Sequence, residues 1–266
     1  MLRSIPTLAF MAAITLAHVE TAAAQEAAAI HVYGPGGPAP AMSDCARAFN
    51  ARNGANVIVI FGPTGRWRDQ ASRDADMFYS GAENMMTDFV QIFATQIDVA
   101  SIEPVYVRSA TIMVHKGNPL KIEHFGDLLR PGVRVMVVQG SGQTGLWEDI
   151  AGRIGDIATI KALRRNIVAF EPDTATAHEV WNGSNPPDAW IALASEHGAH
   201  PDESEVIALE PNLAIVRDAG IALTKAGEGK LAAKASPRRR RSMTSFVRRT
   251  AWRCSSDRAG RIDNRL

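Results

Sequence analysis

The chain has 266 residues, of which 46% are apolar and 21% charged, proportions that are ordinary for a globular protein and exclude a disordered chain. The formal net charge of +1 conceals an asymmetry, because residues 236–266 contain ten Arg and two Asp and the rest of the chain is net negative by about seven charges. The two cysteines, Cys45 and Cys254, form no zinc or redox motif, and whether they pair stays open.

Residues 1–24 have the pattern of a signal peptide. Arg3 precedes an apolar segment, Ile5–Ala17, and three alanines stand before Gln25 as a small-residue cleavage pattern. The apolar segment is too short to span a bilayer, and no other stretch approaches ~20 apolar residues. We therefore expect an exported, periplasmic protein whose mature part is long enough for one large domain or two α/β lobes.

Short apolar runs followed by small-residue turns and helical segments recur along the chain. Because parallel strands place such turns on the same edge of a sheet, where ligands bind and helix N-termini favour anions, this arrangement predicts a binding edge. The turns are Gly34–Pro38 after Ile30–Tyr33, Gly62–Gly65 after Val57–Phe61, Ser80-Gly81 after Ala75–Tyr79, and Gln139–Gly145 after Val133–Val138.

Several other kinds of site are disfavoured. The turns Gly62–Gly65 and Gly140–Gly145 lack the Lys-Ser or Lys-Thr of a phosphate loop and fit no dinucleotide fingerprint. Ser141 is not in a nucleophile elbow, because Gln139 stands where that motif has glycine. Only His197 and His200 lie close together among scattered histidines, so we expect no metal site and no cofactor.

A small anion or a polar small molecule suits the turns better. Hydroxyl and backbone N–H groups can surround an oxyanion without a counter-cation. Capping of the following helices is the alternative role for such hydroxyls. Glu83 could favour a helix dipole or bind an amine-bearing ligand. The candidate donors are Thr64, Ser80, Ser141 and Thr144, with Arg66 adding charge, Trp67 and Trp190 able to line a site, and Trp147 and Trp181 expected in the core.

The order of elements predicts an α/β fold of two Rossmann-like lobes with mixed sheets, joined by two crossings of the chain. We expect lobe one at 28–104 plus 209–235 and lobe two at 105–208, followed by a basic tail at 236–266. No internal repeat or low-complexity segment precedes that tail.

The chain resembles periplasmic solute-binding proteins of ABC importers, and the molybdate-binding branch most of all. The resemblance covers about residues 28–225 and rests on the order of several short motifs rather than on any one of them. These motifs are Tyr33–Gly37, Phe61–Gly65, Ala75–Gly81, Gly117-Asn118-Pro119, Asp127-Leu128-Leu129 and Asp218–Ala222.

The resemblance implies the two-hinge, type 2 periplasmic binding-protein fold, a monomer without enzymatic activity or affinity for nucleic acid, and an inner-membrane ABC permease as partner. It implies an interlobe ligand site for a molybdate- or tungstate-like oxyanion. An organic polar or carboxylate ligand stays open, as do a sensor partner and a secreted esterase-like enzyme. The implied ligand-binding residues are Gly34, Gly36, Gly37, Thr64, Gly65, Arg66, Trp67, Ser80, Gly81, Glu83, Ser141, Gln143, Thr144 and Trp190.

The Arg-rich tail departs from that family, whose members end in a helix packed on lobe one. A solvated basic tail is one interpretation. The other is a frameshift, because codons that take the third base of one residue and the first two of the next can spell a sequence ending in Lys-Arg-Ser-Gly-Trp, as the usual terminal helix does. Sequencing the gene around codon 235 distinguishes the two.

Overall fold

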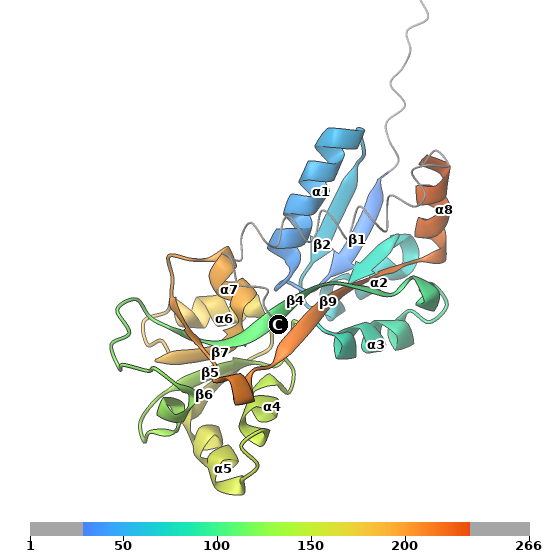
Figure 1. Ribbon diagram of the computed structural model, residues 1–266. Helices are drawn as coiled ribbons and strands as arrows, with labels where there is room; N and C mark the ends of the chain where they lie inside the picture. The colour runs from blue at the N-terminus through green and yellow to red at the C-terminus, as the bar shows by residue number, and fades with distance from the viewer. Residues whose placement is uncertain (1–28, 235–266) are drawn as a thin grey trace, which may run out of the picture.

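The computed structural model describes residues 29–234 (Figure 1), so the expectations for the signal peptide, for the tail and for Cys254 fall outside the described residues. In chain order the elements are β1 (Ile30–Gly34), α1 (Ala39–Asn53), β2 (Val57–Phe61), α2 (Thr64–Asp74), β3 (Met77–Tyr79), α3 (Glu83–Ile92), η1 (Val99–Ser101), β4 (Glu103–Val114), η2 (Phe125–Leu129), β5 (Val135–Val138), α4 (Leu146–Gly152), α5 (Ile157–Asn166), β6 (Ile167–Glu171), α6 (Thr174–Trp181), β7 (Ala189–Leu193), α7 (Ala194–Ala199), β8 (Glu205–Ala208), η3 (Pro211–Leu213), β9 (Val216–Leu223) and α8 (Lys225–Lys234).

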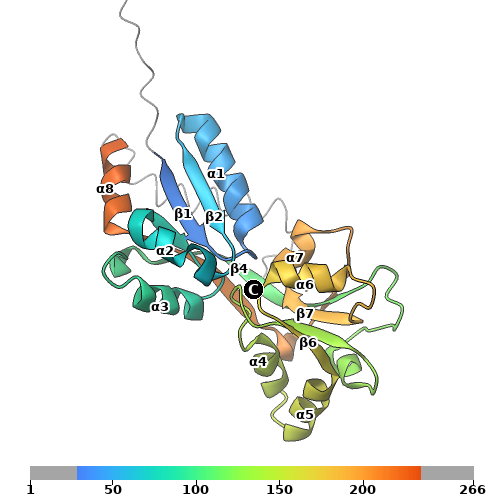
Figure 2. The same cartoon turned by 180° about the vertical axis from the view of Figure 1, so that it is seen from behind.

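The strands form one curled mixed sheet in the order β2-β1-β3-β9-β4-β7-β5-β6, with β8 paired to β4. Strands β2, β1 and β3 are parallel, as the repeated strand–turn–helix pattern predicts, and β5 is parallel to both β6 and β7. The mixed α/β fold is therefore confirmed. The two antiparallel strands β4 and β9 lie in the middle of the sheet and run from one half of the molecule into the other (Figures 1 and 2).

Each half has its own apolar core. In the first half Val32 and Ile221 pack on one face of β1–β3, and an aromatic cluster packs on the other. The second half contains the largest core, which includes Ile112, Val135 and Ile191. Leu213 and Ile215 belong to that second core, with Leu209 against it, so the chain returns to the first half only at β9.

Strand β2 is less buried than the sequence predicts. It is the edge of the sheet, and Phe61 at its end is 56% exposed. An apolar run of this length is typical of a central strand, but only the pairing of distant strands decides which strand lies at an edge. This position sets the place of the turn Gly62–Gly65 discussed below.

Helix α8 is attached to the first half through a buried carboxylate. Asp76 is 1% exposed, and its Oδ2 accepts hydrogen bonds from the His31 N–H at 3.0 Å and from Lys230 Nζ at 2.9 Å. A β-carbon at Gly227 would lie 2.7 Å from the carbonyl carbon of Asp76, so α8 approaches β3 as closely as glycine permits. Asp76, the acidic residue of the Ala75–Gly81 motif, thus has a structural role.

A second carboxylate closes the loop before β5. Asp127 accepts hydrogen bonds from the backbone N–H groups of Glu123 at 2.7 Å and His124 at 3.0 Å, which hold the pKa of this carboxyl below its ordinary value. Across residues 29–234, none of the helices combines the length and the apolar character that crossing a membrane requires.

Candidate ligand-binding site between the two halves

Turns from the two halves meet at one junction. The backbone of Gly81, after β3, touches that of Ser141-Gly142, after β5, so closely that a β-carbon at Gly81 would lie 2.7 Å from the carbonyl carbon of Ser141. A β-carbon at Gly37, after β1, would lie 3.6 Å from the β-carbon of Ser141 and 3.1 Å from Glu196 Oε1. Three predicted turns, two from the first half and one from the second, therefore converge.

The first turn is fixed by the tyrosine of β3. Tyr79 is buried and donates a hydrogen bond from its hydroxyl to the carbonyl of Pro35 at 2.9 Å. A β-carbon at Gly34 would lie 2.5 Å from the Tyr79 ring, so only glycine fits there. Gly34 thus supports the site, whereas Gly36 faces Thr174 of the second half, with its β-carbon position 3.2 Å from Thr174 Oγ1.

Arg108 of β4 brings a buried positive charge to this junction. The side chain is only 4% exposed, and its Nη2 donates to the Gly81 carbonyl and, at 3.5 Å, to that of Asp218. Its Nε and Nη1 atoms are buried and have no hydrogen-bond partner within the described part of the chain. Nη1 lies 3.7 Å from the β-carbon position at Gly37, so the unpaired side of the guanidinium faces the convergent turns.

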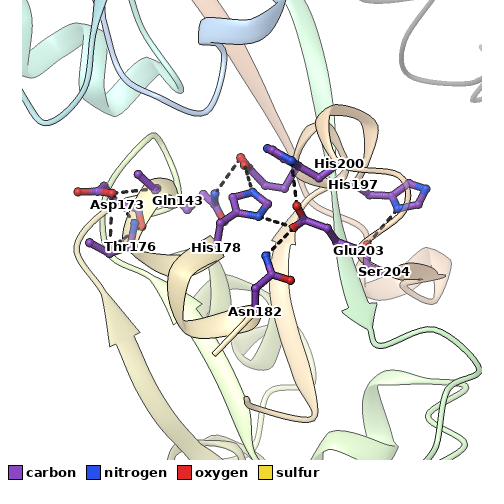
Figure 3. A network of polar contacts seen from close by, with 11 residues as sticks. Gln143, Asp173, Thr176, His178, Asn182, His197, His200, Glu203 and Ser204 are labelled. Carbon is purple, nitrogen blue, oxygen red and sulfur yellow. Dashed lines mark hydrogen bonds and ion pairs between the residues drawn. The ribbon is translucent and has the colours of Figure 1, made fainter. Parts of the chain in front are cut away.

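A network of polar side chains continues from the junction into the second half (Figure 3). Gln143 is buried and its Nε2 donates to Glu196 Oε1 at 3.5 Å, while Glu196 Oε2 lies 3.7 Å from His178 Nε2. Burial lowers the pKa of His178, but its contacts with Glu196 and Glu203 outweigh burial and raise it above the ordinary value. The two carboxylates thus favour the protonated form of His178.

On the first-half side, Ser80 and Asp218 complete the polar surroundings. Ser80 is fully buried and its Oγ accepts a hydrogen bond from the Gly220 N–H at 3.2 Å, which leaves its own proton available to donate. The Oδ2 atom of Asp218 is buried without a partner among residues 29–234. Partial burial and then the charge of Asp218 raise the pKa of the exposed Glu83.

The structure separates the sequence-predicted site residues into two groups. Those brought to the junction or beside it are Gly34, Gly36, Gly37, Ser80, Gly81, Glu83, Ser141 and Gln143. In contrast to the expectation, Trp67 is in the aromatic core, 2% exposed, with its Nε1 bonded to the Gly62 carbonyl. Trp190 is likewise buried in the core of the second half.

Thr64, Gly65 and Arg66 begin α2 at the end of the edge strand β2, where Gly65 and Arg66 are exposed. A β-carbon at Gly65 would meet nothing within 4 Å. Thr144 is also exposed and bonds the Gln139 carbonyl of its own turn at 2.7 Å. Gly65, Arg66 and Thr144 are thus exposed rather than buried at the junction.

Sequence reasoning missed Arg108, Asp218, Glu196, Thr174 and His178. One signal was present, because Arg108 is the only charged residue between Val105 and Val114. A charge within an otherwise apolar strand needs a partner or a function. The other residues lie on elements whose proximity to the junction depends on pairing across the whole chain.

Two halves joined by two central strands, with turns from both meeting around a buried cation, define the class of type 2 periplasmic binding proteins. The chain belongs to the bacterial extracellular solute-binding protein family, whose model matches residues 30–235. Members of this family bind small ligands and deliver them to ABC permeases, and they are not enzymes. Among functionally curated proteins, none matches the chain at a significant level.

Solved structures similar to this chain agree with that assignment. Peb3 from Campylobacter jejuni is 30% identical, with a TM-score of 0.72, and the match covers 87% of this chain and 98% of Peb3. The L-phospholactate-bound form of PEB3 is 32% identical over 82% of this chain and 97% of that chain, with a TM-score of 0.71. The periplasmic molybdate-binding protein of Azotobacter vinelandii is 14% identical over 84% and 97% of the two chains, with a TM-score of 0.60, and shows the fold alone.

Proposed function

We propose that this protein captures a small organic anion bearing a phosphate or carboxylate group between its two halves and presents it to an inner-membrane ABC permease. The observation that carries the proposal is the buried guanidinium of Arg108, with two nitrogen atoms that have no partner among the described residues.

The two halves act as the lobes, and the packing of Leu213 and Ile215 favours a return crossing at about residue 216 rather than at the predicted 209.

Burial of an unpaired charge is costly, so a partner is required for Arg108. The free energy lost by removing a guanidinium from water is recovered only if a hydrogen-bonded anion replaces the water. The planar fork of Arg matches phosphate and carboxylate oxygens, and charge-assisted hydrogen bonds of this kind are about twice as strong as neutral ones. An anion that reaches Nε and Nη1 from the turns would supply that partner.

The carboxylates at the junction favour an organic ligand over a bare oxyanion. Glu196 and Asp218 accept hydrogen bonds but donate none when ionised, so they would repel a second anionic oxygen and attract a hydroxyl or amine. The L-phospholactate bound by the relative PEB3 is an organic molecule of the proposed kind. The molybdate- or tungstate-like oxyanion predicted from the sequence stays as the competing ligand.

Thermal unfolding of the mature chain against a ligand panel tests the proposal. The panel contains L-phospholactate, its two parts L-lactate and inorganic phosphate, other carboxylates, amino acids, sulfate, molybdate and tungstate. A ligand at ~100 times its dissociation constant adds ~2.7 kcal/mol, equivalent to about 5–11 °C for a chain of this size. We expect the largest shift in unfolding temperature from an organic phosphate or carboxylate. That ligand should be recovered unhydrolysed, because the protein is proposed to bind it and not to cleave it.

Arg108→Met is the diagnostic variant, because it keeps a long apolar side chain and removes the charge. It should abolish the ligand shift and change the ligand-free unfolding temperature little, because loss of the buried charge is offset by loss of the Nη2 hydrogen bonds to the Gly81 and Asp218 carbonyls. A shift with molybdate and tungstate alone would restore the oxyanion hypothesis. An unchanged ligand shift in Arg108→Met would refute the role assigned to Arg108.

A further inference from the structure

A second cluster of side chains lies beyond the junction, on the outer side of His178 (Figure 3). His178 of α6 contacts Glu203, with 2.9 Å between Nδ1 and Oε2, and His200 at the end of α7 contacts the same carboxylate, with 3.1 Å between Nδ1 and Oε1. One potential ligand atom from each of these three residues lies within 4.8 Å of the others. Two imidazoles and one carboxylate thus face a common point.

We propose that His178, His200 and Glu203 bind a divalent transition-metal ion, with Zn²⁺ as the preferred ion. Neutral imidazole and carboxylate are ordinary ligands of Zn²⁺, and three protein ligands with one open position are a common zinc arrangement. Tetrahedral geometry with bonds of about 2.0–2.1 Å separates ligand atoms by about 3.3 Å. The two histidine–glutamate contacts are within a few tenths of an ångström of that separation, and all three ligand atoms lie within 4.8 Å of one another.

The surroundings of Glu203 hold it in place for this role. Trp181 Nε1 donates to the Glu203 carbonyl at 3.1 Å, and Asn182 Nδ2 donates to its Oε2 at 3.1 Å. These bonds fix both the backbone and the side chain of the acidic residue before any metal arrives. Supporting contacts of this kind preorganise a metal site.

The far side of His178 provides a second, independent observation. When Nδ1 of an imidazole binds a metal, the proton resides on Nε2 and needs an acceptor. Nε2 of His178 is buried with no hydrogen-bond partner in residues 29–234, and Glu196 Oε2 lies 3.7 Å away from it. Glu196 is therefore the carboxylate that would accept this proton and orient the ring in a carboxylate–histidine–metal arrangement.

The three side chains differ in their exposure to solvent. The side chain of His200 is 44% exposed, that of Glu203 27% and that of His178 16%. An ion can therefore enter past His200, with water in the open position. Because His200 is at the surface, its substitution should leave the fold intact.

Titration of chelator-treated, full-length mature protein with Zn²⁺ tests the proposal. We expect one ion per chain, and Co²⁺ in its place should give the visible absorption spectrum of a tetrahedral site. His200→Gln should weaken Zn²⁺ binding by at least about 10-fold, and Glu196→Gln, which removes an orienting carboxylate rather than a ligand, by about 10- to 100-fold.

The matched control is His197→Gln. His197 lies on the same helix but bonds Ser204 Oγ at 3.0 Å instead of facing the cluster, so its loss should leave Zn²⁺ binding unchanged. Cys254→Ser removes any contribution from that thiol. The proposal is overturned if the wild type binds no Zn²⁺, or if His200→Gln, still folded by circular dichroism, binds it with unchanged affinity.

Discussion

Substitution of Gly81 by Ala should weaken ligand binding without unfolding the protein. A β-carbon at this position would overlap the Ser141 carbonyl oxygen and lie 2.7 Å from its carbonyl carbon and 3.1 Å from the Gly142 nitrogen. Since carbon atoms prefer separations of about 3.5–4.0 Å, the two turns would have to part by roughly 0.8 Å or more.

The cost of that separation falls on the closed arrangement alone, because the two turns belong to different halves. Overpacking of this kind costs about 1–3 kcal/mol, which corresponds to an affinity lower by about 5- to 150-fold. We infer that the halves of the ligand-free protein can part, so its unfolding temperature should change little. The ligand can shift the halves together only by as much as it binds the closed state better.

Isothermal titration with the best ligand of the panel measures the effect, and Gly65→Ala is the matched control. Gly65 lies in the first half near the start of α2, and a β-carbon there meets nothing within 4 Å. This variant should bind normally and gain up to about 1 kcal/mol of stability. Wild-type affinity in Gly81→Ala would show that the turns do not meet in the liganded protein.

Three further substitutions test other parts of the structure. Asp76→Ala removes the carboxylate that holds α8 and should cost about 2–3 kcal/mol, seen as an unfolding temperature lower by about 4–12 °C; an unchanged temperature would mean that the contact with Lys230 is not stabilising. Asp127→Asn should cost about 1 kcal/mol of stability at pH 7. Because folding lowers the pKa of Asp127, the ionised carboxylate stabilises the protein above the unfolded pKa near 3.9, and this stabilisation is lost in acid. Denaturation of both proteins from pH 7 to pH 2 should therefore show convergence, and a constant difference would contradict it. Glu83→Gln should raise stability at pH 7 by at most about 0.5 kcal/mol, since a raised pKa means stabilisation that is lost as pH rises; the gain should vanish below about pH 4, and a loss of stability at pH 7 would contradict the repulsion by Asp218.

The sequence predicts the fold well because its strand and turn signals are local. The strand before Gly34–Pro38 and the one before Ser80-Gly81 are adjacent and parallel, and their turns reach the junction together with the turn at Gln139–Gly145. The periodicity of the apolar residues, the placement of glycine and proline, and the apolar character of each run are sufficient to predict these strands and turns.

The membership of the site depends on long-range pairing that no local pattern contains. The turn Gly62–Gly65 resembles its neighbours in composition, yet it follows the edge strand β2. Its Gly62 N–H donates to the Gly34 carbonyl at 3.1 Å, but a β-carbon at Gly65 would meet nothing within 4 Å. Trp67 follows that turn, but the aromatic rings of Phe78, Phe89 and Phe93 surround it and place it in the core.

Arg108 and Asp218 are residues of the site that local sequence patterns do not identify. They are 110 residues apart in the chain and become neighbours because β4 and β9 pair in the middle of the sheet. A single charged residue in an apolar strand indicates that something must compensate it, but not what or where. The sequence therefore predicts the binding edge and leaves its central arginine, Arg108, unassigned.

A crystal structure of the protein with L-phospholactate tests the central proposal most directly. The ligand should lie between the two halves, with phosphate or carboxylate oxygens about 2.7–2.9 Å from Nε and Nη1 of Arg108. A ligand bound elsewhere, or a guanidinium that contacts only protein in the complex, would contradict the proposed site.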